Sequence, residues 1–381
     1  MKKVAIVTLI GYYNYGNRLQ NYATQEVIKD LGYEVQTIIY YKRVEARKEA
    51  LNVAIKRKMT SFLNKTNKQR YYTLKNKLIH ILYKDLIYKR RRAFKLFTQT
   101  NISETDIIYD DYIFNNLAED YDFFVTGSDQ VWHPFIGDKP LYFLTFAPKG
   151  KRIAYAPSFG VAELPESCLE DYKKYISEIP YLSVREQSGA DIIKKLTGRE
   201  AIVLVDPTLM LTKEKWMSIS KPAVHKPSRR YLLTYFLGEL SNDAKKLIKT
   251  IAAHRNLEVV QLATFKDKKR FTADPAEFID YVNSSDIVLT DSFHGTLFSI
   301  LFEKPFIVFN RIGIGPSIVS RIETLLSKFK LESRRWQSMK GKNMDDLMND
   351  LFEIDFSHVP SILEAERKKA LGFLKMALNA E

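Results

Sequence analysis

A single stretch of this chain, residues 286–302, joins a buried strand, a polar turn and the start of a helix. The run Ile287–Thr290 is typical of a strand buried in a sheet. The apolar run Leu297–Phe302 indicates a helix, and the turn between them reads Asp291-Ser-Phe-His-Gly-Thr296. Open α/β sheets bind ligands where a strand ends in such residues and a helix begins. The stretch therefore predicts an α/β fold and a ligand site.

His294 is the side chain of this turn that can exchange a proton near neutral pH. The helix start offers free N–H groups and the positive end of a dipole, so an anion is favoured there. A purely structural interpretation also fits, because Ser292 and Thr296 are good capping residues and His294 could simply be hydrogen-bonded at the helix start. The local pattern leaves both interpretations open.

Strands and helices alternate in two separate parts of the chain, which is typical of parallel α/β sheets. The first part has strands at 4–9, 34–40, 121–126, 152–156, 181–184 and 201–205, with helices at 18–31, 168–177 and 189–196. The second has strands at 231–236, 258–262, 287–290 and 306–309, with helices at 243–253, 276–284 and 296–302. Helices near 317–329 and 361–378 follow. We predict an α/β fold of two Rossmann-like domains facing across a cleft, GT-B-like in architecture, with a basic helical insert in the first domain.

The predicted domain limits are placed where the residue composition changes along the chain. The first domain covers 1–217 and contains the insert at 42–97, and a proline-bearing linker at 218–229 leads to the second domain at 230–345. A helical tail covers 346–381. The active site is expected in the cleft between the two domains.

The net charge of +14 comes from the insert, where residues 42–95 hold 18 Lys and Arg and three acidic residues. A solvated helical hairpin, an anionic membrane surface and nucleic acid are three explanations for such a segment. The membrane is our preferred functional interpretation, and nucleic acid is not expected because no nucleic-acid-binding fold accompanies the charge. With one cysteine, Cys168, and no apolar stretch long enough to cross a bilayer, the chain is expected in the cytoplasm, peripheral at the inner face of the membrane.

The chain lacks the sequence patterns of several common kinds of site. The six histidines are scattered, with no CxxC or HxxxH spacing, so no metal site is predicted. Walker, GxGxxG and GxSxG motifs are absent, so neither those nucleotide-binding loops nor a serine-hydrolase elbow is predicted. Instead, amides, hydroxyls and arginines follow strands in both halves, a composition suited to an anion site with a proton-transfer group.

Five motifs, in this order and spacing, resemble the polysaccharide pyruvyl transferase family: Asn14-Tyr-Gly-Asn17, Gly127-Ser-Asp-Gln-Val-Trp132, Ser183-Val-Arg-Glu186, Asp206-Pro-Thr208 and Thr290-Asp-Ser-Phe-His-Gly295. The resemblance implies transfer of pyruvate from phosphoenolpyruvate to hydroxyls of a sugar as a ketal, with no further cofactor. The acceptor would be a glycan or a lipid-linked oligosaccharide. One departure is Ser292, where many members of the family have arginine.

The resemblance implies that His294 is the general acid or base and that Arg185 binds the phosphate or carboxylate of the donor. Asp129 completes the catalytic candidates. The candidate substrate-binding residues are Asn14, Gly16, Asn17, Arg18, Gly127, Ser128, Gln130, Trp132, Ser158, Ser292, Gly295, Thr296, Asn310 and Arg311. Trp132 suits a buried core as well as a sugar-stacking platform. A GT-B glycosyltransferase using a nucleotide sugar and a non-catalytic glycan-binding protein are the alternatives.

Overall fold

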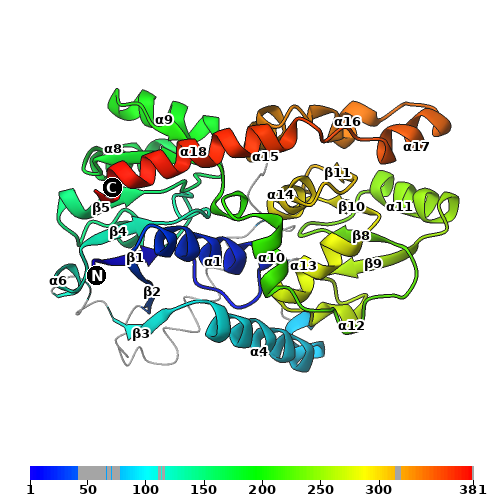
Figure 1. Cartoon of the computed structure of the whole chain (residues 1–381), viewed down its shortest axis with the longest axis horizontal. Helices are drawn as coiled ribbons and strands as arrows, with labels where there is room; N and C mark the ends of the chain where they lie inside the picture. Colours follow the sequence, from blue (N-terminus) through cyan, green and yellow to red (C-terminus); the bar gives the residue numbers. More distant parts are fainter. Residues whose placement is uncertain are drawn as a thin grey trace.

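Seven parallel strands form the sheet of the first domain (Figure 1). The computed structural model describes residues 1–41, 66, 70, 78–109, 113, 116–313 and 319–379. In sheet order the strands are β3 (Glu104–Ile108), β2 (Glu34–Tyr40), β1 (Lys3–Val7), β4 (Phe123–Thr126), β5 (Arg152–Ala154), β6 (Tyr181–Val184) and β7 (Ile202–Val203). Strand β1, which lies between β2 and β4, is buried from Val4 to Val7, as its apolar sequence requires.

Helices cover this sheet on both sides, as parallel strands require. The helices of this part of the chain are α1 (Tyr15–Asp30), α4 (Lys84–Asn101), α6 (Leu117–Asp120), α7 (Lys139–Tyr142), α8 (Leu169–Ser177), α9 (Gln187–Thr197) and α10 (Lys213–Ile219), of which α4 and α10 also contact the second domain. Asn14 caps α1 by accepting a hydrogen bond from Asn17 N. The helix therefore begins at Tyr15, earlier than the predicted start at 18, and this brings the whole Asn14–Asn17 motif to the helix N-terminus.

Four parallel strands form the second sheet, in the order β11 (Phe306–Val308), β10 (Ile287–Thr290), β8 (Tyr231–Tyr235) and β9 (Glu258–Leu262). Its helices are α11 (Asn242–His254), α12 (Lys268–Phe271), α13 (Pro275–Ser284), α14 (Phe293–Leu301), α15 (Val319–Lys328), α16 (Trp336–Met339) and α17 (Met344–Phe352). The two sheets confirm the predicted α/β class with two Rossmann-like domains.

One hydrophobic core continues from the first domain into the second. Tyr15 of α1 stacks on Phe278 of α13 with ring centroids 4.5 Å apart, and its hydroxyl donates to Ala273 O at 2.9 Å. The stretch between α10 and β8, where the linker is predicted, is fastened to α13, because Ala223 N donates to Asp280 Oδ2 at 2.8 Å. These contacts fix how the two strand-end edges face each other.

The end of the chain divides between the domains. Leu347, Met348 and Leu351 of α17 belong to the core of the second sheet. The last helix, α18 (Val359–Leu378), returns to the first domain, where Tyr33 Oη donates to Leu378 O at 2.6 Å and Arg367 donates to Leu209 O at 2.7 Å (Figure 1). This return is long-range and carries no local sequence signal.

Most of the predicted basic insert, 42–97, lies outside the described residues. Its described end is helical and continues into α4, which lies along the junction of the domains (Figure 1). Across the described ranges, no helix combines the length and apolar character needed to span a bilayer.

Candidate functional site

The polar turn after β10 builds the start of α14. Ser292 caps the helix, since its Oγ accepts from Gly295 N at 3.4 Å, and Thr296 Oγ1 donates to Ser292 O at 3.0 Å. A Cβ at position 295 would lie 2.5 Å from Thr290 Oγ1, so the close approach requires glycine. These three predicted binding residues therefore support the helix start, and they hold His294 on its first turn.

His294 reaches from the second domain to the first. Its imidazole lies against Gly16 in the first turn of α1, where a Cβ would be 1.9 Å from His294 Nδ1. Its Nε2 is 3.7 Å from Asp206 Oδ2 and has no hydrogen-bond partner in the described parts of the chain. The structure thus brings Gly16 and His294 together from opposite domains. Position 16 must be glycine because a larger side chain would collide with the imidazole.

Asp206 joins several of the motifs. Its Oδ1 accepts from Thr208 N at 3.0 Å and Oγ1 at 2.7 Å, and its Oδ2 accepts from Ser128 Oγ at 2.8 Å and Arg185 Nη1 at 2.6 Å. Burial raises the pKa of the Asp206 carboxyl, but His294, Arg185 and Thr208 outweigh it and hold the pKa well below its usual range. Asp206 is therefore a carboxylate beside the imidazole.

Arg185 is buried at the end of β6, with 3% of its surface exposed. Its guanidinium lies 4.4 Å from the ring centroid of Phe293, the residue before His294. Burial lowers the pKa of Arg185, and the nearby carboxylates of Asp206, Asp129 and Glu186 more than restore it, so the net shift is upward. Its Nε and Nη2 have no hydrogen-bond partner among the described residues. These two N–H groups can bind an anion, because leaving a buried donor unmatched costs about 1–3 kcal/mol.

Asn17 and Asp129 join the first loop to the loop after β4. Asn17 Nδ2 donates to Asp129 Oδ2 at 3.2 Å and to Leu9 O at 2.6 Å. Asp129 Oδ1 accepts from Gln130 N at 2.8 Å. Gly127, at the start of this loop, donates its N–H to Val7 O at 3.0 Å. The Asp129 side chain therefore positions two loops and lies near Arg185.

Glu186 holds the loop that begins at Ser158, and Gln130 packs over the same loop. Glu186 Oε1 accepts from Ser158 Oγ at 2.9 Å and from the N–H groups of Phe159 and Gly160 at 2.8 and 3.1 Å. Gln130 packs over Gly160, where a Cβ would lie 2.0 Å from its Nε2. Like those of His294 and Arg185 above, this Nε2 is a buried nitrogen with no hydrogen-bond partner within the described ranges. The Ser158 hydroxyl thus helps to position Glu186. The side-chain amide of Gln130 keeps an N–H donor without a partner among the described residues.

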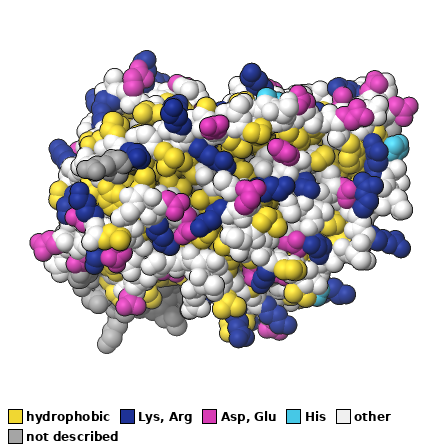
Figure 2. All heavy atoms as spheres, viewed as in Figure 1, with side chains coloured by type: hydrophobic (Ala, Val, Ile, Leu, Met, Phe, Trp, Pro, Cys, Tyr) yellow, Lys and Arg dark blue, Asp and Glu magenta, His cyan; other side chains and the backbone are white. Residues whose placement is uncertain are grey.

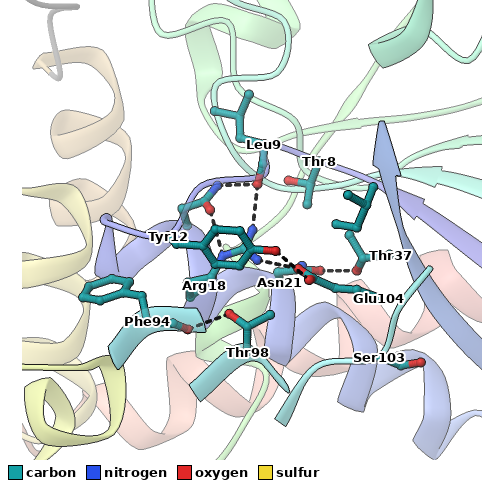
Figure 3. A network of polar contacts seen from close by, with 12 residues as sticks. Thr8, Leu9, Tyr12, Arg18, Asn21, Thr37, Phe94, Thr98, Ser103 and Glu104 are labelled. Carbon is teal, nitrogen blue, oxygen red and sulfur yellow. Dashed lines mark hydrogen bonds and ion pairs between the residues drawn. The ribbon is translucent and has the colours of Figure 1, made fainter. Parts of the chain in front are cut away.

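Arg18 belongs to the network shown in Figure 3, which shares Asn17 and Leu9 O with the first loop. Its Nη1 pairs with Glu104 Oε1 at 2.8 Å, its Nε donates to Asn17 Oδ1 at 3.0 Å and its Nη2 donates to Leu9 O at 3.0 Å. Tyr12 Oη donates to the other oxygen of Glu104 at 2.9 Å. Each nitrogen of the Arg18 guanidinium therefore already has a protein partner, which argues against its predicted role in substrate binding.

The prediction that Trp132 binds substrate is wrong. Its side chain is fully buried, its ring stacks on Phe143 with centroids 4.8 Å apart, and its Nε1 donates to Tyr142 O at 3.2 Å. A sugar-stacking platform must expose a ring face, whereas this ring fills the core beside Phe159.

Arg311 and Asn310, after β11, lie on the second-domain side of the site. Arg311 Nη2 donates to Asp291 O at 3.1 Å, and its Nε is 3.6 Å from Asp291 Oδ2. Burial raises the pKa of Asp291, and Arg311 opposes that shift. Asn310 is exposed, and its Oδ1 accepts from Arg335 Nη2 at 3.3 Å. Arg311 is therefore tied to the His294 turn through Asp291, and no contact joins Asn310 to the cluster in the described part of the chain.

Two residues outside the predicted set enter the site. Asp206 follows β7 in an Asp-Pro-Thr motif that also predicts a simple turn, and its side chain does cap the 3₁₀ turn Pro207–Leu209. Arg321 of α15 is buried, with its guanidinium 5.9 Å from the Phe293 ring. Burial and the neighbouring Arg185 lower its pKa to about 9. The Asp-Pro-Thr motif could have identified Asp206 from the sequence, whereas no sequence pattern indicated Arg321.

The assembled cluster can bind an anion and move a proton. We define it as His294, Asp206, Arg185, Gln130 and Arg321. It takes residues from both domains, and four of its buried nitrogens have no hydrogen-bond partner among the described residues: Arg185 Nε and Nη2, Gln130 Nε2 and His294 Nε2. In the described ranges, no group of three or more His, Cys, Asp and Glu side chains is arranged to hold a metal ion.

The model of the polysaccharide pyruvyl transferase family matches residues 14–312 of the chain. This range contains every member of the cluster except Arg321. No curated protein matches the chain.

Solved structures share the fold at low sequence identity. An S. aureus MnaA–UDP co-structure has a TM-score of 0.53 at 10% identity, covering 100% of this chain and 98% of that one. A UDP-N-acetylglucosamine 2-epimerase from Rickettsia bellii has a TM-score of 0.50 at 11% identity, covering 100% and 97%. At this identity the likeness concerns the fold alone, and it agrees with the GT-B-like arrangement of two Rossmann-like domains.

Proposed function

The chain belongs to the polysaccharide pyruvyl transferase family, and from this premise we propose that it transfers pyruvate from phosphoenolpyruvate to two hydroxyls of a sugar, forming a ketal. The observation that carries the proposal is the position of His294. It stands at the domain junction, next to the Asp206–Arg185 pair, and two nitrogens of that arginine, Nε and Nη2, have no hydrogen-bond partner among the described residues.

The donor brings about three negative charges at neutral pH, on one carboxylate and one phosphate. Arg185 Nε and Nη2 and Gln130 Nε2 are proposed to bind these oxygens, and Arg321 adds positive charge beside them. Ser292 occupies the position where many family members have arginine, so the anion contacts are assigned to side chains from other elements.

The reaction needs a proton on the methylene carbon of the donor, which makes the neighbouring carbon electrophilic. One sugar hydroxyl then adds to that carbon and loses its proton, the phosphate leaves with the C–O electron pair, and a second hydroxyl closes the ring and also loses its proton. The products are the ketal and inorganic phosphate. His294 is proposed to give or take these protons, with Asp206 stabilising the imidazolium.

The acceptor is proposed to be a glycan or its lipid-linked precursor, and the proposed chemistry calls for no further cofactor. Placing two hydroxyls against one carbon is chiefly a problem of orientation. A junction where residues of both domains meet is suited to it, because donor and acceptor can be held by different domains.

Phosphate release from phosphoenolpyruvate in the presence of candidate glycan acceptors tests the proposal, with ketal formation followed by mass spectrometry. His294→Ala is expected to lower the turnover rate about a thousandfold, because general acid–base catalysis contributes on that order. His254→Ala, on the exposed end of α11, is the matched control and should retain the rate.

Retained turnover in His294→Ala would remove this residue from proton transfer. Transfer from a nucleotide sugar, with no phosphate release from phosphoenolpyruvate, would overturn the proposal in favour of a glycosyltransferase.

A further inference from the structure

An exposed face of the helical segment around α4 combines large apolar side chains with positive charge. Five of the exposed large hydrophobic residues of the described chain lie within 78–96, with exposed fractions between 57% and 74%: Leu78, Ile81, Leu82, Tyr88 and Leu96. Residues 78–96 also contain six Lys and Arg and a single acidic residue, Asp85. A helix face that only needed to be solvated would not expose this much apolar surface.

The two kinds of side chain share one side of the helix. Tyr88, Arg92 and Leu96 follow at four-residue intervals, so they align on its outward face. The opposite side carries Arg90 and Phe94, which are buried against the rest of the protein. The segment is therefore amphipathic in an unusual sense, because its outward side is both apolar and basic.

The second domain extends this surface at α12. Tyr83 stacks on Phe265 with ring centroids 4.5 Å apart, and Lys268 Nζ lies 5.5 Å from the Tyr83 ring centroid. Next to this contact is a shallow hollow of about 590 Å³, whose lining includes the exposed Lys266, Lys268 and Lys269. Figure 2 shows hydrophobic and basic side chains intermingled along the lower edge of the molecule, where Figure 1 places α4 and α12.

We propose that this α4–α12 surface docks on an anionic lipid bilayer, with Tyr88, Leu96 and their apolar neighbours entering the interface and the lysines of the hollow binding lipid phosphates. Charge complementarity and exposed aliphatic groups together favour a bilayer. A nucleic acid would satisfy the charge but would leave Ile81, Leu82 and Leu96 against phosphates and water.

Docking there would fix the orientation of the domain junction that carries His294. Arg90, on the buried side of α4, donates to Phe271 O of the second domain at 2.6 Å and to Tyr13 O of the first at 3.0 Å. Tyr13 stands three residues before Gly16, which contacts His294. The docking surface is thus one layer of side chains away from the loop that forms the site, and a lipid-linked acceptor would reach that site from the same bilayer. Docking itself does not depend on the proposed chemistry.

Flotation of the full chain with vesicles tests the proposal. Vesicles of phosphatidylcholine with phosphatidylglycerol should bind the protein, vesicles of phosphatidylcholine alone should bind it far less, and added salt should weaken binding. Each basic side chain near an anionic surface strengthens partition by about fivefold. Reversing three charges, Lys89→Glu, Arg92→Glu and Lys95→Glu, is therefore expected to weaken partition by at least about a hundredfold.

The double variant Tyr88→Ser, Leu96→Ser should also weaken partition, but it should change the salt dependence less than the charge reversals do. This difference separates the contribution of apolar insertion from that of charge. The control variant reverses three exposed lysines of α8 and α9, which lie across the molecule from α4 in Figure 1 (Lys173→Glu, Lys174→Glu and Lys195→Glu), and should bind vesicles like the parent. Phosphate release with a water-soluble acceptor should be the same in all these proteins, so a failure of docking is distinguishable from a failure of the chemistry.

Three results would overturn the proposal. The first is no binding to anionic vesicles at low salt. The second is equal loss of binding in the α4 and control variants, or no loss in either. The third is binding of an RNA oligonucleotide that is tighter than vesicle binding and depends on the same α4 residues.

Discussion

Two buried arginine–carboxylate pairs of the first domain differ in how completely they are satisfied. Arg18 pairs with Glu104 at 2.8 Å, and each nitrogen of its guanidinium has a partner within the protein. Arg185 pairs with Asp206 at 2.6 Å through Nη1 alone, and no described residue accepts from Nε or Nη2. Burial is nearly equal, with 0% and 3% of the two arginines exposed.

The difference separates a structural pair from one suited to a ligand. Burial outweighs Glu104 and lowers the pKa of Arg18, whereas three carboxylates outweigh burial and raise the pKa of Arg185. A buried arginine held strongly in its charged form, with two N–H groups unmatched, is arranged to receive an anion. Both arginines follow strands in the sequence, so position at a strand end did not distinguish them.

Gly16→Ala should have the largest effect, because it displaces His294 while leaving both arginines in place. The new Cβ would lie 1.9 Å from His294 Nδ1, so the imidazole must move. Turnover is expected to fall about a thousandfold, as for loss of a general acid–base group, measured as phosphate release.

Gly137→Ala is the control for this substitution, since nothing lies within 4 Å of a Cβ at that position. Equal turnover in the two variants would mean that the contact between α1 and His294 does not matter for the reaction.

Arg18→Met should act on stability more than on activity. It removes the partner of Glu104 Oε1 and one of the two donors to Leu9 O, and breaking a buried pair by removing one side costs about 3 kcal/mol. Urea unfolding should show this loss, while kcat/KM of the folded protein changes by less than about tenfold. A large loss of kcat/KM at unchanged stability would make Arg18 part of the site and erase the contrast with Arg185.

The pH dependence of Asp206 should give the smallest effect. Its pKa is lowered in the folded protein, so its contribution to stability is complete above the ordinary aspartate pKa of about 4 and is lost as pH falls below that value. The difference in unfolding free energy between the parent and Asp206→Asn should therefore be constant near neutral pH and shrink in acid. A difference that already shrinks between about pH 7 and 5 would contradict the lowered pKa.

Much of the fold followed from local patterns. Buried β-branched strands alternating with helices predicted both sheets, and the strand-end turns predicted that His294, Gly16 and Arg185 would gather at the domain junction. Elements whose patterns are weak or whose contacts are distant escaped prediction. The edge strand β3 is half-exposed and short, so its alternation is faint. The return of α18 to the first domain depends on contacts more than 150 residues apart.

The side chains of the site show the same limit. Asp206 caps a turn and also holds Arg185, and a sequence indicates only the first of these roles. Trp132 is indistinguishable in sequence from a sugar platform, because its burial depends on Phe143 and Phe159. Arg321 approaches from α15, which follows the last strand of the second sheet in the chain, and no spacing links it to Arg185.

Titration calorimetry with phosphoenolpyruvate on Arg185→Lys tests the central claim most directly. Lysine keeps the charge beside Asp206 but lacks the planar guanidinium with its two unmatched N–H groups. We predict that the parent binds phosphoenolpyruvate and that Arg185→Lys binds it about a hundredfold more weakly, a change of about 2.7 kcal/mol, with unfolding free energy nearly unchanged. Equal affinity in the two proteins, or no binding by the parent, would contradict the assignment of Arg185 as the anion-binding residue of this site.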